Sequence, residues 1–434
     1  MLLSNLLASL SLFDLIYAGE AFDVNFQANL SGIPEEPQPN ATSQLLAADL
    51  QVSENFDDLE DTQERPRSSA WTHDPECIHS EDSTEEYCVY TNNSFAHGRG
   101  ISFFASPKIA ARIAELSAFT DHAIHDNVNT FDDAPWEIRN IPGRGNGLFA
   151  TRLLHRGDHI ISDTPVGVFQ SDAFFLDYPI GYRYLHTAFD RLPDVTKDIV
   201  MRTAAHSPGD PYMERINTNA FAGDFEGAPH FFLYPETALM NHDCRPNTLY
   251  YHDTSSLIHA TYASRTILPG EEITITYTNI LQPRSERRSV LKQSWGFHCQ
   301  CSLCSRSDSD IEESDARIKK ISDLQTHLSD WTSNSIATPA MAEQLLELYD
   351  QEGVHAAKGL GHMLAALTYN AAGDVSQAKK HARLAIEAGV VTDGSRETDE
   401  NDMEALTANP KGHWSYLVRK IQELEGKMGI KREI

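Results

Sequence analysis

The densest group of chemically capable side chains is a polar heptad at residues 241–247, Asn-His-Asp-Cys-Arg-Pro-Asn. Proline removes a backbone donor and asparagine favours turns, so the heptad predicts a loop and not the middle of a helix or strand. The flanking residues 231–240 are mostly apolar, and the aromatic pair Tyr250-Tyr251 follows. A buried amide or imidazole without a partner costs about 1–3 kcal/mol. A polar loop in so apolar a neighbourhood is therefore expected to hold something.

Four cysteines could bind a metal. Cys299, Cys301 and Cys304 form a Cys-x-Cys-x-x-Cys motif, and Cys244 lies in the heptad. Structural zinc takes four tetrahedral ligands, so these four thiols predict one closed zinc site that fastens the later segment onto the heptad. Free buried thiols or a redox pair are the alternatives for the motif by itself.

Three further features are ambiguous when taken alone. The run Arg144-Gly145-Asn146-Gly147 follows a strand-like segment, and its glycines would let the backbone approach a ligand, although most such loops are ordinary turns. Tyr277 ends an apolar strand after Gly-Glu-Glu-Ile-Thr-Ile-Thr, which is also the common position of a core tyrosine. Phe297, just before the thiols, would by itself be taken for a core residue.

Together, the heptad, the segment Gly270 to Tyr277 and the three-cysteine motif resemble the core of SET-domain lysine methyltransferases, of the SET-and-MYND type. The resemblance implies a methyl donor, S-adenosylmethionine, a structural zinc on the four cysteines, and a threaded fold in which Asn241-His242 passes beneath the strand that ends at Tyr277. It implies contacts to the methyl donor at these matching positions: Arg144, Gly145, Asn146, Gly147, Asn219, Asn241, His242 and Phe297.

The same resemblance makes Tyr277 the expected catalytic residue. Methyl transfer to an amine needs a neutral lysine, a dry site and reacting atoms held about 3–3.5 Å apart. A lysine with a pKa of about 10.4 is charged at neutral pH, and a dry channel beside a positive donor lowers that value. A tyrosine hydroxyl can orient the amine, and an aromatic wall attracts its cationic form.

The resemblance covers about residues 138–304 and has a gap. Six cysteines in the chain cannot also supply the Cys/His zinc module of the SET-and-MYND family, which puts the family's peptide contacts in doubt. We expect a protein-lysine N-methyltransferase acting on a histone or another protein. The alternative is a SET-like interaction module that has lost turnover and binds partners through its helical tail.

The expected fold class is α+β: short SET-domain strands with a helical insertion and a zinc-bound tail, then an all-α C-terminal domain. The expected divisions are a signal-like and acidic leader, a segment with two cysteines, the SET domain with its insertion at about 171–216, the post-SET zinc segment, and the helical domain, at 1–69, 70–134, 135–280, 281–306 and 307–434. One helical hairpin within 362–388 resembles a tetratricopeptide-type repeat, and only one copy is visible.

Charge and composition narrow the partners and the location. The formal net charge of −28 disfavours direct nucleic-acid binding and favours a substrate lysine in a basic segment. No apolar run is long enough to span a membrane. Residues 2–18 resemble the apolar part of a signal peptide but lack a preceding basic residue, so secretory entry stays open, while a thiolate zinc site favours an intracellular protein. Cys77 and Cys88 predict a disulfide or two buried thiols. The oligomeric state is not predictable.

Overall fold

The computed structural model describes residues 70–78, 86–174, 180–206, 208–225, 227–389 and 396–428, and every structural statement below concerns these residues. The signal-like stretch and the acidic leader expected within residues 1–69 lie outside them. Within the described part, no helix combines the length and the apolar character needed to cross a bilayer.

Short strands dominate the middle of the chain. The strands are β1 (Glu76–Ile78), β2 (Tyr87–Asn92), β3 (Ile101–Ala105), β4 (Trp136–Ile141), β5 (Gly145–Ala150), β6 (His159–Asp163), β7 (Gly167–Gln170), β8 (Ala220–Phe225), β9 (Ala228–Leu233), β10 (Asn241–His242), β11 (Thr248–Asp253), β12 (Ile258–Ala263) and β13 (Glu272–Ile275).

Helices interrupt the strands and then take over. The α-helices are α3 (Phe95–Gly98), α4 (Pro107–Ile113), α5 (Ser117–Thr120), α6 (Ser171–Phe174), α7 (Ile180–Asp190), α8 (Asp194–Met201), α9 (Pro211–Asn219), α10 (Arg284–Trp295), α11 (Asp308–Ser329), α12 (Pro339–Glu352), α13 (Lys358–Ala371), α14 (Val375–Glu387), α15 (Arg396–Ala408) and α16 (Val418–Met428). The 3₁₀ turns are η2 (His122–His125), η3 (Thr237–Leu239) and η4 (His355–Ala357).

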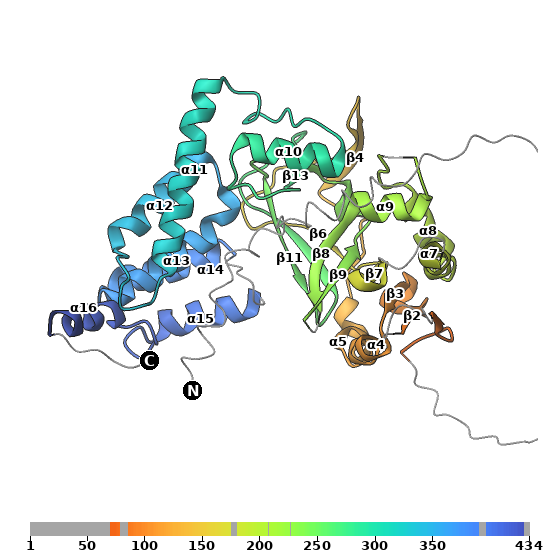
Figure 1. Ribbon diagram of the computed structural model, residues 1–434, viewed down its shortest axis with the longest axis horizontal. Coiled ribbons are helices and arrows are strands. Elements are labelled where there is room, and N and C mark those ends of the chain that lie inside the picture. The colour runs from red at the N-terminus through yellow and green to blue at the C-terminus, as the bar shows by residue number, and fades with distance from the viewer. Residues whose placement is uncertain are drawn as a thin grey trace, which may run out of the picture.

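The strands form three small sheets, so the α+β class expected from the sequence is confirmed. The six-stranded sheet has the order β1-β2-β3-β7-β9-β8, the four-stranded sheet β10-β13-β5-β4, and the three-stranded sheet β11-β12-β6. Most neighbours are antiparallel, but β3 pairs with β7 and β10 pairs with β13 in parallel. Figure 1 shows the strands gathered on one side of the molecule and helices α11 to α16 on the other.

The segment before residue 135 completes the six-stranded sheet. Strand β3 lies beside β7, with Phe103 opposite Val168, and this pairing attaches the first three strands to the later ones. Helix α4 covers this sheet: the Ser106 side chain caps it, Pro107 is its first residue, and Ile109 and Ile113 are buried. No sequence motif predicts the sheet pairing itself.

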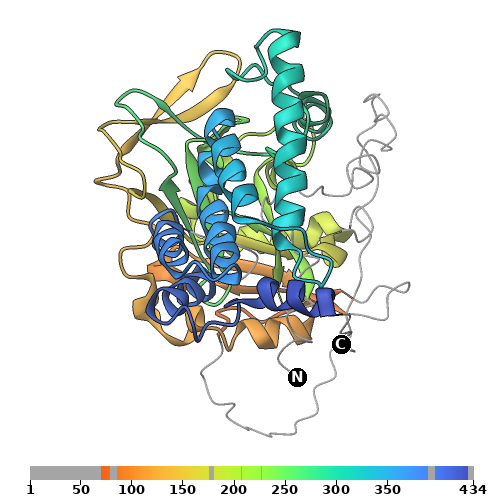
Figure 2. The same ribbon diagram turned by 90° about the vertical axis from the view of Figure 1, so that its left-hand side faces the viewer.

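The helical domain is held by two apolar clusters. One joins α11, α12 and α13 and includes Ile280, which comes from the segment just after β13. The other packs α13 against α14 through small side chains such as Ala378 and Ala382, so the expected helical hairpin is present. Figure 2 views the molecule from the helical side, with α11 to α14 in front of the strands.

The heptad forms the expected loop, and its buried polar groups have partners. Its first two residues are β10, and Asn247 near its end is 1% exposed. The Asn247 amide donates to the Glu272 carbonyl (2.8 Å), and its side-chain oxygen accepts from the Thr274 backbone N–H (2.9 Å). These bonds tie the loop to β13, the strand that leads to Tyr277.

Candidate active site and metal centre

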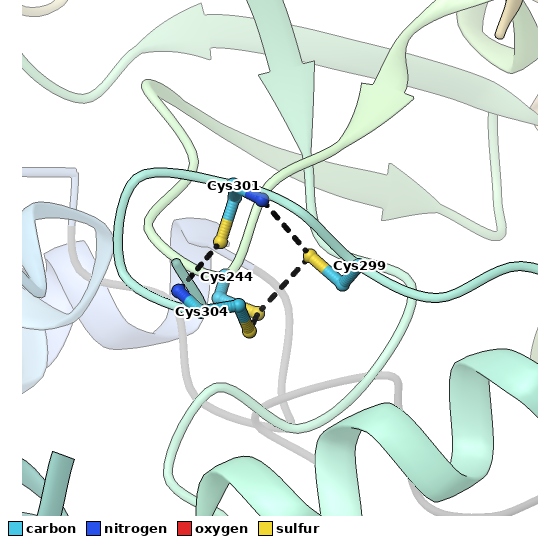
Figure 3. Close-up of side chains that lie close together, drawn as sticks. All are labelled: Cys244, Cys299, Cys301 and Cys304. Atoms are coloured by element: carbon cyan, nitrogen blue, oxygen red, sulfur yellow. Dashed lines mark hydrogen bonds between the residues drawn. The ribbon is translucent and has the colours of Figure 1, made fainter. Parts of the chain in front are cut away.

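The four predicted metal ligands come together. Cys244 lies in the loop after β10, and the other three lie in the turn after α10 (Figure 3). All four sulfur atoms lie within 4.8 Å of one another, and the Cys244 sulfur is 3.9 Å from that of Cys299 and 3.5 Å from that of Cys304. Four sulfurs about 2.3 Å from a tetrahedral zinc would stand about 3.8 Å apart. The spacing therefore fits one metal ion with four thiolate ligands.

The surroundings of the cluster also suit thiolates. The Arg287 side chain is completely buried, and its Nε donates to the Cys244 sulfur (3.3 Å). A buried cation needs a negative partner, and thiolates provide it. Backbone N–H groups of Cys301 and Cys304 point at the sulfurs of Cys299 and Cys301 (both 3.5 Å). Hydrogen bonding among the four sulfurs lowers the pKa of Cys301 to about 5 and lowers that of Cys304, while it raises the pKa values of Cys244 and Cys299, so the proton of one thiol is shared with its neighbours.

His242 connects this cluster to the end of β13. Its Nδ1 accepts a hydrogen bond from the backbone N–H of Tyr277 (3.0 Å), so Nε2 carries the proton and faces the Cys244 sulfur at 3.3 Å. Burial lowers the pKa of His242 to about 3, so the imidazole is neutral at physiological pH. The histidine is therefore a fixed spacer between the sulfurs and the tyrosine.

Tyr277 lies in an aromatic corner. Its hydroxyl donates to the Met240 carbonyl (2.8 Å), and its ring centre lies 5.5 Å from that of His242 and 5.2 Å from that of Trp295. Burial raises the pKa of the Tyr277 hydroxyl above its usual value of 10, so the phenol remains protonated. Trp295 is in turn fixed by its indole N–H, which donates to the Thr218 carbonyl (3.0 Å).

Glu272 connects the glycine-rich loop at residues 144–147 to the heptad. Arg144 binds both of its carboxylate oxygens (3.0 and 3.1 Å), and the Asn241 amide donates to one of them (2.9 Å). Asn241 also donates to the Asn146 carbonyl (3.0 Å). A Cβ at Gly147 would stand 2.8 Å from the Asn241 side-chain nitrogen, so a larger residue there would displace the Asn241 amide. Gly145 has φ +77°, a conformation that glycine adopts without strain.

Phe297 and Asn219, the last two residues predicted to contact the methyl donor, differ in whether their side chains face the site. The Phe297 ring lies 6.3 Å from His242, centre to centre, so it faces the same corner. The side-chain amide of Asn219 is turned to the end of its own helix and donates to the carbonyls of Ala204 and Arg215 (both 2.7 Å). Asn219 approaches the site through its neighbour Thr218, which binds Trp295.

Sequence interpretation misses three residues of this arrangement: Glu272, Arg287 and Trp295. Glu272 belongs to the Gly-Glu-Glu motif, and Trp295 lies two residues before Phe297, so a signal existed for both. Arg287 sits in an ordinary charged helix, and nothing in its local sequence marks it as buried.

The other cysteines form a separate structure. Cys77 and Cys88 face each other across β1 and β2 and are joined by a disulfide, the first of the two expected states. The Glu86 carboxylate lies near both sulfurs. A bonded sulfur pair leaves no thiolate for a metal, so this group is not a second zinc site.

Strand β10 pairs in parallel with β13, which leads to Tyr277, and the loop after β10 carries one of the four clustered thiols. Residues 145–278 match the SET domain family model. Over this stretch the chain is therefore similar to SET domains. It is 29% identical over 200 residues to "Histone-lysine N-methyltransferase set5" of Schizosaccharomyces pombe, a match covering 46% of this chain and 57% of that protein.

Two animal proteins match shorter stretches. "N-lysine methyltransferase SMYD2" of Homo sapiens is 34% identical over 112 residues, which is 25% of each chain. "SET domain-containing protein SmydA-8, isoform A" of Drosophila melanogaster is 40% identical over 93 residues, 20% of each chain. The matches thus span less than two thirds of the length of these relatives.

Proposed function

We propose that this protein is an S-adenosylmethionine-dependent protein-lysine N-methyltransferase. The observation that carries the proposal is the position of Tyr277 between His242 and Trp295, beside a segment closed by Cys244 and the three later thiols. The names of the two methyltransferases it resembles support the same reaction. The eight predicted contact residues remain our proposal for the donor site, with Glu272 as the group that orders Arg144 and Asn241.

Each side chain has a task that follows from its chemistry. S-adenosylmethionine, when bound, supplies the methyl group on a sulfonium. Tyr277 keeps its proton on the Met240 carbonyl, so its oxygen is left to accept a hydrogen bond and orient the amine. Because burial raises its pKa, the Tyr277 phenol is protonated and is not available as a base, so we propose that the lysine proton leaves to solvent before transfer. The rings of Trp295 and Tyr277 form the wall that excludes water.

We assign the four cysteines to one structural zinc. With four protein ligands the ion has no open position for a water, so its role is to hold the tail over the heptad. The acidic chain, at −28, suits a substrate lysine in a basic segment of a histone or another protein. We propose an intracellular location, because thiolate zinc sites persist under reducing conditions.

Calorimetric titration of the zinc-loaded protein with S-adenosylmethionine tests the donor site directly. We expect one binding event per chain. A folded, zinc-loaded sample that binds no donor would contradict the enzyme proposal and leave the interaction module as the better description.

Tyr277→Phe tests the catalytic role. Removing one preorganised hydrogen-bonding group from an active site lowers turnover about 10²- to 10³-fold, and we expect a loss of that size in methyl incorporation from labelled donor. Donor binding should stay within a few-fold of the parent. Tyr369→Phe, which makes the same change in the helical domain, is the matched control. A Tyr277→Phe protein as active as the control would remove Tyr277 from the mechanism.

A further inference from the structure

Arg245 connects the heptad to the helical domain. It follows the metal ligand Cys244, and its guanidinium donates to the carbonyl of Glu352 (Nε, 2.6 Å) and to a carboxylate oxygen of the same residue (Nη2, 2.8 Å). Its remaining nitrogen, Nη1, donates to the Cys244 carbonyl (2.6 Å) and to the Ile280 carbonyl (3.1 Å). One guanidinium thus holds both the backbone of a thiol-bearing residue and the end of a helix.

Glu352 is placed where a lone glutamate would be unfavourable. It is the last residue of α12, before Gly353 in a left-handed conformation, and its side chain is only 1% exposed. A helix C-terminus carries partial negative charge and unpaired carbonyls. Arg245 supplies a cation to the carboxylate and a donor to the carbonyl, so it offsets both costs at once.

Two more side chains from the helical domain bind the Glu352 carboxylate. The Ser314 hydroxyl binds one oxygen (2.7 Å), and the Arg317 Nε binds the other (2.5 Å). Burial by itself would raise the pKa of Glu352, but the bonds from Ser314, Arg245 and Arg317 lower it, so the group is ionised. These three partners therefore hold the Glu352 carboxylate in one orientation.

The apolar contacts between the same regions reach a different part of the chain. Ile280 packs with Leu345, Leu348 and Tyr349, which secures the segment after Tyr277. In contrast, the polar contacts of Glu352 reach Cys244 through a single side chain, Arg245.

We propose that Glu352 is a positioning residue: acting through Arg245, it fixes the heptad so that Cys244 and Asn241 stand where the metal and the methyl donor require them. The inference rests on the proposed function and adds the helical domain to the site. Loss of the Glu352 carboxylate would leave Arg245 with backbone carbonyl partners and without its ionic partner. The heptad would then be held less firmly, and the Cys244 sulfur would sample positions farther from the other three. The metal would be held less tightly, and donor affinity would fall with it.

The test compares Glu352→Gln with the parent in the full-length zinc-loaded protein. We measure zinc release to a chromogenic chelator and donor affinity by calorimetry, at a temperature where circular dichroism shows every variant folded. Loss of an outer-shell partner typically lowers metal affinity about 10- to 100-fold, and we expect faster zinc release and weaker donor binding in that range. Glu347→Gln, the same change at an exposed position on α12, should match the parent.

A further variant separates positioning from general stability. Leu406→Ala opens a cavity in the second apolar cluster of the helical domain, away from Arg245, and lowers stability without touching the heptad. If Leu406→Ala releases zinc as fast as Glu352→Gln, Glu352 acts through stability alone and the inference is wrong. We also expect Arg245→Gln combined with Glu352→Gln to add little to either single change, since the two residues act as one unit.

The outcomes separate this inference from the proposed function. A parent protein that binds neither zinc nor donor would contradict the proposed function. A parent that binds both, with Glu352→Gln unchanged in zinc release and in donor affinity, would overturn the inference and leave the function standing.

Discussion

The two cysteine groups of this protein differ in what surrounds their sulfurs. The four thiols at Cys244 and 299–304 face a buried guanidinium, an imidazole and backbone N–H groups. Cys77 and Cys88 face each other across two strands, and Cys88 is packed among apolar and aromatic side chains. Donors stabilise thiolates, and thiolates bind metals, whereas the apolar side chains and the Glu86 carboxylate near Cys77 and Cys88 do not favour a thiolate. The neighbours of the cysteines therefore decide their chemistry.

The two groups also call for opposite redox conditions. Disulfides persist in oxidising compartments, and thiolate zinc sites are retained where thiols stay reduced. Removing each cysteine group in turn shows which of them the S-adenosylmethionine site requires.

The largest effect is expected at the metal centre. Cys244→Ser removes one of four ligands from a type of site whose apparent binding free energy is about 10–16 kcal/mol. We expect the purified variant to contain no zinc by atomic absorption and to bind no S-adenosylmethionine. Chelation of the parent should give the same result. Full zinc content in the variant would mean that Cys244 is not a ligand.

Loss of the disulfide should have a smaller and separate effect. Replacing Cys77 and Cys88 by alanine opens a loop between cysteines 11 positions apart, which we expect to lower the free energy of unfolding by about 3 kcal/mol in urea titrations. Zinc content and donor affinity should not change, because the disulfide lies in a different sheet from β10 and β13. If zinc is lost together with the disulfide, the two cysteine groups are coupled and do not act independently as we expect.

The smallest effect concerns the charge of the metal centre. Arg287→Met removes the buried cation beside Cys244, and we expect metal affinity to fall about 10- to 100-fold in competition with a chelator. Lys292→Met, an exposed position on the same helix, is the control. If the four thiols were neutral, removing an unneeded buried charge would stabilise the protein, so an increase in stability with unchanged metal affinity would contradict the thiolate assignment.

The local parts of this site are predictable from sequence, since motif and spacing carry them. The cysteine motif and the heptad predict the thiol cluster, and the Ser106-Pro107 pair predicts the start of α4, because ligand number and helix capping depend on adjacent residues. The SET-domain resemblance placed Asn241-His242 beneath the strand that ends at Tyr277, and the structure pairs β10 with β13 in parallel, which no periodicity would indicate.

The parts that depend on distant contacts are not predictable in this way. Arg287 looks like any charged residue of an exposed helix until the thiols are placed beside it. Glu352 lies 107 positions after Arg245, and nothing near either residue marks them as partners. Likewise, the pairing of β3 with β7 brings Phe103 beside Val168, and strand sequences alone do not specify which neighbour they choose.

The long separation between Arg245 and Glu352 has a consequence for synthesis. At about 5–20 residues per second, the 107 positions between them take on the order of 5 to 20 s to translate. During that interval Arg245, next to Cys244 in the heptad, has no Glu352 carboxylate to bind. The contact between Arg245 and Glu352 is therefore made late, after all four cysteines have been translated, and chains that terminate before Glu352 lack it.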